Sequence, residues 1–231
     1  MVTTYCLELT RDLTASEYAS FQGLAGPQKQ KRLSQYQNYQ DAQRSLCGDL
    51  LLLYMLRDQF ALTISLDSIR NGTYGKPYFH NKRSVEYNLS HSGAWVVGCV
   101  STGGSAGIDV ETWDKKGSPR VMQYFSDEEK EYITEIPACF EQRFYGIWTL
   151  KESYLKAEGT GLHQPLNAFS ITMKEREIEV FAGGKKLKHQ FKQYVLGKNA
   201  ICSVCSRTAD FQGPVNLGMQ QLVDFIQKVI A

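Results

Sequence analysis

Apolar residues recur at every third or fourth position in two long stretches of the chain, residues 27–60 and residues 140–157. This spacing places them along one face of an α-helix, so we expect two long helices that each bury one side. Pro27 suits the start of the first helix, where a missing N–H costs no hydrogen bond. A shorter amphipathic helix is expected near the end of the chain from Met219, Leu222, Val223, Ile226 and Val229.

Short runs of apolar and β-branched residues predict β-strands. They cover residues 2–9, 95–100, 107–111, 168–173, 176–182, 188–195 and 199–205. Gly103 and Gly104 favour a turn between two of these runs, so we expect a hairpin over residues 95–111. Residues 70–94 are rich in Gly, Asn, Pro and Ser and predict a loop with short extended pieces, and residues 112–125 predict an exposed connection. Helices combined with antiparallel strands indicate an α+β protein.

A further helix is predicted to begin at Ser126 and to end before Pro137, because Ser126 and Glu129 have the spacing of a capping box. In the helix predicted over residues 140–157, Lys151 falls near the middle of the apolar face. Its ammonium group must therefore reach solvent along its stem or find an anionic partner.

Composition excludes several classes of protein. The chain has 231 residues, enough for one large domain or two small ones. Its hydrophobic fraction of 42% and charged fraction of 22% are typical of a soluble folded protein and not of a disordered one. The net charge of 26 − 24 = +2 gives no support for nucleic acid as the main partner. The longest dense apolar run, Leu50–Leu56, is far shorter than the roughly 20 residues of a membrane-spanning helix.

Six cysteines are scattered along the chain, and its start has no pattern of a secretory signal. We therefore expect reduced thiols and a cytoplasmic protein. Cys202 and Cys205 form a C-x-x-C pair inside a predicted strand, but a structural zinc site needs a second pair of ligands. Packing in the core is the expected role of both thiols.

The segment Gly107-Ile-Asp-Val-Glu111 places two acids two residues apart in a predicted strand. Since side chains alternate between the faces of a strand, Asp109 and Glu111 project from the same face. Two carboxylates so close repel each other unless a cation lies between them, and Mg²⁺ is commonly held by such oxygen ligands. The polar face of a half-solvated strand is the alternative.

The predicted helix over residues 140–157 carries Glu152 and Lys156 one turn apart, beside its apolar face. They form either an ordinary surface ion pair or a third carboxylate beside a cation for phosphate. In Asn88-Leu-Ser-His-Ser-Gly93, small residues let backbone N–H groups approach an anion, and His91 can bind phosphate when it is protonated. His91 can equally be structural, and the fragment lacks the G-x-S-x-G pattern of a nucleophilic serine.

Basic residues near the start of the first long helix, Lys29 and Arg32, are followed by Arg44. They form either a solvated helix face or an anion site.

Taken together, these segments resemble the Sfp-type 4′-phosphopantetheinyl transferases over residues 26–169. The motifs that carry the resemblance are Gly75-Lys-Pro77, Asn88-Leu-Ser-His-Ser-Gly93, Gly107-Ile-Asp-Val-Glu111 and Trp148-x-x-Lys-Glu-Ser-x-x-Lys156. Each motif alone is modest, but four of them in this order are highly specific. Shorter similar stretches are Gln40–Arg44, Gly48–Leu50, Glu158–Leu162 and Pro165–Phe169.

The resemblance implies an α+β fold of two pseudo-twofold-related halves, each a small antiparallel sheet with a long helix. The halves would be residues 1–104 and 105–231, with the active site in the cleft between them. The implied reaction moves the 4′-phosphopantetheine arm of coenzyme A, the co-substrate, to a serine of an apo acyl- or peptidyl-carrier protein and releases adenosine 3′,5′-bisphosphate. Such carriers serve fatty acid, polyketide and nonribosomal peptide synthesis. With Mg²⁺ as its cofactor, the protein is expected to be a cytoplasmic monomer that binds neither membranes nor nucleic acid.

The resemblance also implies roles for single residues. Asp109, Glu111 and Glu152 would hold Mg²⁺. Glu152 is the candidate base for the carrier serine, directly or through water, and Lys156 would neutralise the pyrophosphate. The implied contacts with coenzyme A are Lys29, Arg32, Arg44, Lys76, Ser90, His91 and Lys156. Among these, Lys29, Arg32, Arg44 and His91 correspond to contacts with the 3′-phosphate.

Lys115, Lys116 and Arg120 are candidate contacts with a carrier protein, because carriers are typically acidic around their serine. Two other classes of function stay open. One is a non-catalytic module that binds coenzyme A or a carrier, which the full set of acids with Lys156 disfavours. The other is a different Mg²⁺-dependent phosphoryl or nucleotidyl transferase, and the lack of a P-loop motif in the sequence disfavours the use of a nucleoside triphosphate.

Overall fold

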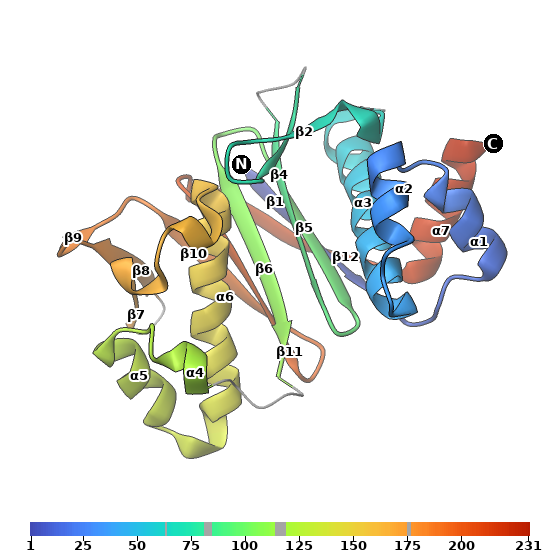
Figure 1. The fold of residues 1–231 in the computed structure, drawn as a ribbon. Helices are drawn as coiled ribbons and strands as arrows, with labels where there is room; N and C mark the ends of the chain where they lie inside the picture. Colours follow the sequence, from blue (N-terminus) through green and yellow to red (C-terminus); the bar gives the residue numbers. More distant parts are fainter. Residues whose placement is uncertain (63, 81–84, 114–118, 175–176) are drawn as a thin grey trace.

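Two long helices lie against two adjoining β-sheets, one helix in each half of the molecule (Figure 1). The computed structural model describes residues 1–62, 64–80, 85–113, 119–174 and 177–231. An α+β fold with a small sheet and a long helix in each half, as expected from the sequence, is confirmed. Among the helices of the described residues, none is long and apolar enough to cross a membrane.

The first half is built on a four-stranded sheet with the order β12-β1-β5-β4. β1 (Val2–Glu8), β5 (Trp95–Ser101) and β4 (Glu86–Ser92) run antiparallel to one another in turn, whereas β12 (Phe211–Leu217) is parallel to β1. The long helix α3 (Tyr39–Phe60) packs on β5 and β4. The other elements of this half are α1 (Ala15–Gln22), α2 (Pro27–Leu33), η1 (Leu66–Ser68), β2 (Ile69–Asn71), β3 (Pro77–Phe79) and α7 (Met219–Ile230).

The second half is built on a three-stranded antiparallel sheet with the order β10-β11-β6. Its strands are β6 (Ala106–Thr112), β10 (Gln190–Leu196) and β11 (Ala200–Ser206), and α6 (Phe140–Glu158) lies on β6 and β11. A smaller sheet joins β7 (Ser170–Lys174), β8 (Glu177–Ala182) and β9 (Lys185–Lys186). The remaining elements are α4 (Pro119–Met122), α5 (Asp127–Thr134), η2 (Pro137–Cys139), η3 (Gly161–His163) and η4 (Leu166–Ala168).

The main chain of α6 lies directly on β6, because β6 has a glycine at the contact. A Cβ atom at Gly107 would collide with the carbonyl oxygen of Ser153 and with the backbone nitrogen of Ala157. The glycine of the motif Gly107-Ile-Asp-Val-Glu111 therefore has a packing reason. It lets the face of α6 that carries Lys156 come within hydrogen-bonding reach of β6.

Side chains of β4 join the two halves. Asn88, Ser90 and Ser92 share one face of this strand, since side chains alternate along it. Asn88 Oδ1 accepts a hydrogen bond of 2.9 Å from the backbone N–H of Ile108 on β6, and both serines donate to carboxylates of β6. An apolar cluster that contains residues of β1, β5, β6 and β11 lies behind this junction, so the two sheets share a core.

The single long helix predicted over residues 27–60 is wrong, because two helices, α2 and α3, occupy this stretch. Residues 34–38 separate them. The backbone N–H of Ser34 bonds the Gln30 carbonyl and closes α2, and Asn38 Oδ1 accepts from the Gln40 N–H at 2.8 Å and starts α3. Asparagine favours this N-cap position because its side chain replaces a missing helical partner. The sequence pattern also missed α1.

The loop predicted over residues 70–94 is wrong at its end, where residues 86–92 form β4. The hairpin predicted over residues 95–111 is wrong as well, since β5 pairs with β4 and β1, while β6 pairs with β11. β4 and β5 are joined by a two-residue turn in which Gly93 has a φ of 55°. A glycine adopts this left-handed backbone without steric cost.

The other predicted strands, the capping box at Ser126 and the helix over residues 140–157 are confirmed. The terminal amphipathic helix is confirmed as α7, but β12 was not predicted. The packing differs from the expected halves, 1–104 and 105–231, at the end of the chain. β12 pairs with β1, and α7 shares a core with α3, so residues 211–231 pack on the first half.

Lys151 has the anionic partner that its position demanded. Its Nζ lies 2.8 Å from Glu129 Oε1, and both side chains are fully buried. It also donates to the carbonyl oxygens of Leu166 and Phe169 at 2.9 and 2.8 Å. The six thiols are free, and those of Cys202 and Cys205 are buried in β11, as expected for core cysteines.

Candidate active site

β6 presents two carboxylates where the two halves meet. Asp109 Oδ1 accepts hydrogen bonds from Ser90 Oγ at 2.7 Å and from Lys156 Nζ at 2.6 Å. Glu111 Oε2 accepts from Ser92 Oγ at 2.7 Å. The predicted common face of the two acids is therefore confirmed. Side chains of β4 from one half and of α6 from the other contact this face.

Glu152 lies one turn before Lys156 on α6 and belongs to the same cluster. Burial and then repulsion from Asp109 raise the pKa of Glu152 to about 7, with Glu111 adding to the rise and Lys156 opposing it. Its carboxyl group therefore changes protonation near neutral pH, where a general base works well. Asp109 thus bonds Lys156, and Glu152 lies close enough to Asp109, Glu111 and Lys156 for all three to affect its pKa.

The arrangement of the three acids bears on whether they can hold a divalent cation. In the described part of the chain, no three His, Cys, Asp or Glu side chains form a preassembled metal-binding group. Asp109 instead forms an ion pair with Lys156. Asp109 Oδ2, however, is buried and has no hydrogen-bond partner among the described residues. A buried, unpaired carboxylate oxygen beside two further carboxylates is a donor set that suits a hard cation such as Mg²⁺. The residues present fit that ion.

His91 lies on β4; its side chain is partly accessible to solvent, and protein atoms and three cations lie near its ring. The loss of water around its ring and the charge of Arg44 lower the pKa of His91, and Lys156 and Lys29 act in the same direction. Arg44 is held by a hydrogen bond of 2.9 Å to the Gly93 carbonyl oxygen. Anions are attracted to such a concentration of positive charge.

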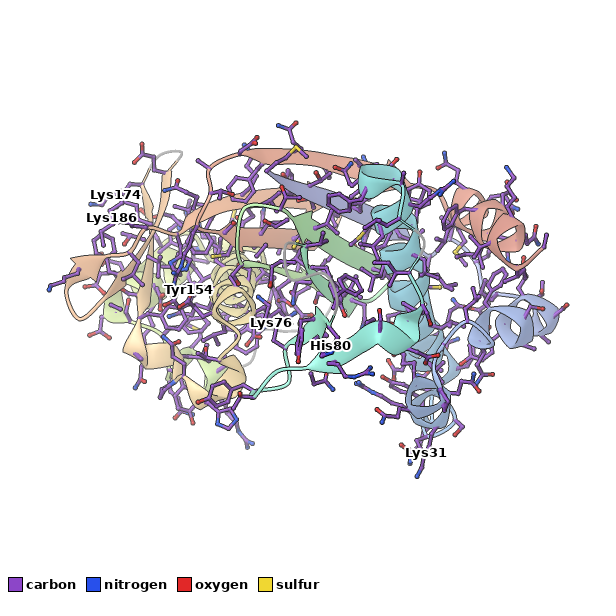
Figure 2. All side chains as sticks on the ribbon, turned by 90° about the horizontal axis from the view of Figure 1, so that it is seen from above. Lys31, Lys76, His80, Tyr154, Lys174 and Lys186 are labelled. Atoms are coloured by element: carbon purple, nitrogen blue, oxygen red, sulfur yellow. The ribbon has the colours of Figure 1, made fainter. Side chains whose placement is uncertain are left out.

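Lys29 and Arg32 extend this positive region onto α2. Lys29 Nζ lies 3.0 Å from Asp49 Oδ2 and donates to the Ser45 carbonyl at 3.1 Å. Burial raises the pKa of Asp49, while Lys29 and then Arg32 act to lower it. The structure therefore brings Lys29, Arg32, Arg44 and His91 into one region. Lys31, by contrast, lies at the outer surface of α2 (Figure 2).

A cavity of about 280 Å³ lies between the halves, with Tyr74, Lys76 and Asn88 on one side and Lys156 on the other. Lys76 lies near the middle of the molecule (Figure 2). Its ammonium group is bonded to the second half, including Ser105 Oγ at 2.7 Å. A larger cavity of about 880 Å³ lies among α2, α3 and α7, and none of the site residues predicted from the sequence lines it.

Comparison with known proteins gives the same family in both halves. Residues 13–102 match a family model described as "4′-phosphopantetheinyl transferase, N-terminal", and residues 105–205 match the 4′-phosphopantetheinyl transferase superfamily. The transferase gsp of Aneurinibacillus migulanus is 32% identical over 201 residues, which cover 84% of this chain and 80% of the relative. The chain belongs to the Sfp-type 4′-phosphopantetheinyl transferase family. The transferase Sfp of Bacillus subtilis (strain 168) is 26% identical over 215 residues, 92% of this chain and 96% of the relative.

The boundary between the two family matches falls in the connection from β5 to β6. The acids of this transferase lie on the second side of that boundary, and His91, Arg44 and Lys29 lie on the first. Ser90 and Lys156 join the two sides, since Lys156 Nζ also donates to Ser90 Oγ at 3.1 Å. The candidate site of this family member is therefore assembled from both matched regions.

Sequence reasoning missed several residues that shape the transferase site. Ser92, which holds Glu111, lay within a quoted motif, and its spacing of two residues from Asn88 and Ser90 would have indicated a shared face if the segment had been assigned to a strand. Asp49 lay within the similar stretch Gly48–Leu50, but nothing local indicated its contact with Lys29, and Ser105 had no signal, because the partners of both are distant in the sequence. Lys115 and Lys116 lie outside the described residues, whereas Arg120 is exposed on α4.

Proposed function

We propose that this transferase moves the 4′-phosphopantetheine group of coenzyme A to a serine hydroxyl of an apo acyl- or peptidyl-carrier protein, and that adenosine 3′,5′-bisphosphate is the other product. The observation that carries this proposal is a junction with two kinds of charge. Asp109, Glu111 and Glu152 lie on one side, and Lys29, Arg44 and His91 lie on the other. A substrate that has a pyrophosphate and a separate 3′-phosphate suits such a divided site.

The acids are proposed to hold Mg²⁺, with Asp109, Glu111 and Glu152 as its protein ligands. When bound, Mg²⁺ supplies positive charge that neutralises the pyrophosphate oxygens. The buried, unpaired Oδ2 of Asp109 supports this role.

Glu152 is proposed to take the proton of the carrier serine. In metal-free protein, burial and Asp109 raise the pKa of Glu152 to about 7, and a cation bound at the acids would favour its carboxylate, the form that accepts a proton. The proton moves from the serine Oγ to a carboxylate oxygen of Glu152, directly or through water, as the serine oxygen attacks phosphorus. Lys156 contributes its charge to the oxygens of the breaking pyrophosphate.

Lys29, Arg32, Arg44 and His91 are proposed to bind the 3′-phosphate. Burial is the main cause that lowers the pKa of His91, and the charges of Arg44, Lys156 and Lys29 add to it; a bound dianion would offset those charges. Ser90, together with the stem and backbone of Lys76, is proposed to face the adenine and the phosphates, because Lys76 lines the cavity beside Lys156. The carrier is proposed to dock near α4, where Arg120 is exposed.

The decisive experiment measures the mass of an apo carrier protein after incubation with the transferase, coenzyme A and Mg²⁺. Transfer adds the mass of one phosphopantetheine arm to the carrier. Asp109→Ala, which lacks a central acid, is the matched control and should leave most of the carrier at its original mass in the time that the wild type needs to complete transfer. Binding of coenzyme A without any mass gain for acyl and peptidyl carriers would identify a non-catalytic binding module and contradict the proposal. Carriers of fatty acid, polyketide and nonribosomal peptide synthesis should be compared in this assay. We further propose that the enzyme is a cytoplasmic monomer.

A further inference from the structure

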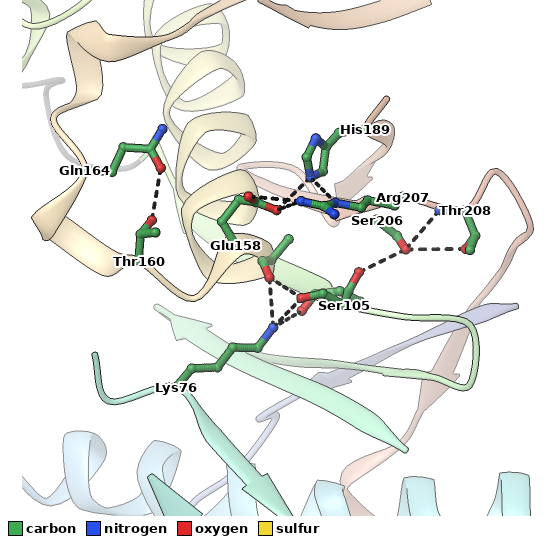
Figure 3. A network of polar contacts seen from close by, with 11 residues as sticks. Lys76, Ser105, Glu158, Thr160, Gln164, His189, Ser206, Arg207 and Thr208 are labelled. Carbon is green, nitrogen blue, oxygen red and sulfur yellow. Dashed lines mark hydrogen bonds and ion pairs between the residues drawn. The ribbon is translucent and has the colours of Figure 1, made fainter. Parts of the chain in front are cut away.

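Lys76 reaches out of the first half and ends among oxygen atoms of the second (Figure 3). Its Nζ donates to Ser105 Oγ at 2.7 Å, to the Ala157 carbonyl at 3.0 Å and to the Ala106 carbonyl at 3.3 Å. Glu86 Oε2 of β4 lies 3.5 Å away. A lysine ammonium has three N–H donors, so these oxygens already occupy all of them.

Ser105 is the centre of this contact. Its Oγ accepts from Lys76 and donates to the Ala157 carbonyl, and its own carbonyl accepts from Ser206 Oγ of β11 at 3.2 Å. The serine therefore connects the lysine, the end of α6 and the sheet below it. Glu158, the next residue of α6, is held separately by Arg207 at 3.0 Å (Figure 3).

The Ala157 carbonyl belongs to the last turn of α6, where carbonyl groups lack partners within the helix. Lys76 and Ser105 supply those partners, and the ammonium also lies at the negative end of the helix dipole. The lysine stem packs on Gly159, where an added Cβ would lie 3.1 Å from Lys76 Cδ. The turn that ends α6 is thus held from the first half.

Lys156 immediately precedes Ala157, and its Nζ donates to Asp109 Oδ1 at 2.6 Å. We propose that Lys76, together with Ser105, is a positioning residue that fixes the last turn of α6 and so holds Lys156 at the acids of β6. The kinetic part of this proposal rests on the proposed transfer reaction. The ammonium of Lys76 thereby serves the protein, while its stem and backbone line the cavity.

The experiment compares Ser105→Ala, Lys76→Met and the double variant with the wild-type enzyme. Ser105 does not line the cavity, so Ser105→Ala breaks the contact without changing the surface that faces the substrate. We expect each single variant to lower kcat about ten- to a hundredfold, because a small displacement of a catalytic group has effects of that order. The Kd for coenzyme A should change less than about threefold, as neither ammonium nor hydroxyl contacts it. The loss in the double variant should be smaller than the product of the two single losses, since the two side chains belong to one hydrogen-bond network at the Ala157 carbonyl.

Ser105→Thr, which keeps the hydroxyl, is the matched control and should restore most of kcat. Hydrogen exchange adds a readout that needs no activity: amides of residues 155–159 should exchange faster in Ser105→Ala, while the thermal midpoint and the exchange of β1 and β5 stay as in the wild type.

Three results would overturn the proposal. One is a normal kcat for Ser105→Ala together with weaker coenzyme A binding by Lys76→Met, which would make Lys76 a substrate contact. Another is multiplication of the two losses in the double variant. The third is faster exchange throughout the chain, which would make the contact a general stabiliser. If the wild-type enzyme transfers nothing to any carrier, the proposed function fails, and the local exchange of α6 still decides whether Lys76 and Ser105 hold this turn.

Discussion

Two lysines lie five residues apart on α6, Lys151 and Lys156, and each pairs with a carboxylate of another element. The two pairs differ in how many of their hydrogen-bonding groups have partners. Lys151 uses its three N–H donors on Glu129 and two carbonyl oxygens. Both oxygens of Glu129 are engaged, since Oε1 also accepts from the Ile171 N–H at 2.6 Å and Oε2 accepts from the Ser126 N–H at 2.7 Å. This pair joins α5, α6 and β7 in the core of the second half.

In the pair of Lys156 and Asp109, by contrast, not every hydrogen-bonding group has a partner, and we call this pair incomplete. Within the described residues, Lys156 donates to Asp109 and Ser90, and Asp109 Oδ2 accepts from nothing although it is buried. The neighbouring Glu152 has its pKa raised by burial and by Asp109. The saturated pair has no capacity left for a ligand, whereas the incomplete pair at the cavity has both charge and an open acceptor. The comparison separates a structural ion pair from a functional one on a single helix.

The largest expected effect breaks the saturated pair. Glu129→Ala leaves the Lys151 charge buried without a partner, which should reduce the free energy of unfolding by about 3–5 kcal/mol. Denaturant unfolding followed by fluorescence measures this loss. The double variant Glu129→Leu with Lys151→Met should recover most of it, because replacing both charges removes the desolvation cost. A single variant that unfolds like the wild type would show that the pair is not structural.

Breaking the incomplete pair should affect catalysis instead. Asp109→Ala should lower kcat for phosphopantetheine transfer about 10²–10³-fold, since the site loses one group that organises transition-state charge. Its free energy of unfolding should fall by less than that of Glu129→Ala, because Lys156 is 27% exposed and can turn to solvent, whereas Lys151 is fully buried. The rate of carrier mass gain measures the loss of kcat, and denaturant unfolding of the same preparation measures the change in stability. Near-normal turnover with Mg²⁺ would contradict the role given to Asp109.

Much of this contrast was visible in the sequence, because it depends on local patterns. Alternation along residues 107–111 predicted the shared face of Asp109 and Glu111, and helical spacing predicted that Lys151 needed an anion. The capping box at Ser126 also predicted where α5 begins. Each of these conclusions uses residues within a few positions of one another, where backbone geometry alone fixes the relation.

Other parts of the site could not be predicted, because distant segments supply them. Residues 86–92 resemble a loop because Asn88, Ser90 and Ser92 are residue types common in turns, whereas in the structure these side chains bond to β6. β12 and α7 return to the first half across the whole chain. Lys76 meets a main-chain oxygen of Ala157, which leaves no trace in the residue types.

Lys29 provides an intermediate case that sharpens the comparison. Within the described residues it contacts Asp49 and the Ser45 carbonyl, so one donor is left for a ligand. Lys29→Ala should weaken coenzyme A about tenfold and dephospho-coenzyme A hardly at all, because a charged hydrogen bond to the 3′-phosphate is lost. Calorimetry with both compounds measures the difference, and Lys31→Ala, on the outer surface of α2, is the control. Equal losses for the two compounds would remove Lys29 from the phosphate site.

A smaller effect is expected in the pH dependence of stability, because Glu152 beside the incomplete pair has a raised pKa. The folded protein holds the Glu152 proton up to a pH of about 7, above the ordinary value for a glutamate of about 4.5. In metal-free protein, the raised pKa therefore leaves the free energy of unfolding unaffected at pH 4, where Glu152 is protonated in both states. Between pH 4.5 and 7 the free energy of unfolding falls, by on the order of 1 kcal/mol after screening. Glu152→Gln should match the wild type at pH 4 and exceed its free energy of unfolding at pH 8. If the two proteins keep a constant difference across this range, the acids do not repel one another as the geometry requires.

The smallest expected effect concerns the surface beyond the incomplete pair. If an acidic carrier docks near α4, Arg120→Glu should raise the carrier KM about two- to threefold at low salt, because one exposed charge mainly changes the encounter rate. The effect should fade at high ionic strength, where exposed charges are screened. Lys228→Glu, an exposed charge reversal on α7 of the other half, is the control and should leave the carrier KM unchanged. Equal responses of the two variants to salt would mean that net charge alone attracts the carrier, and that recognition near α4 depends on shape or apolar contact instead.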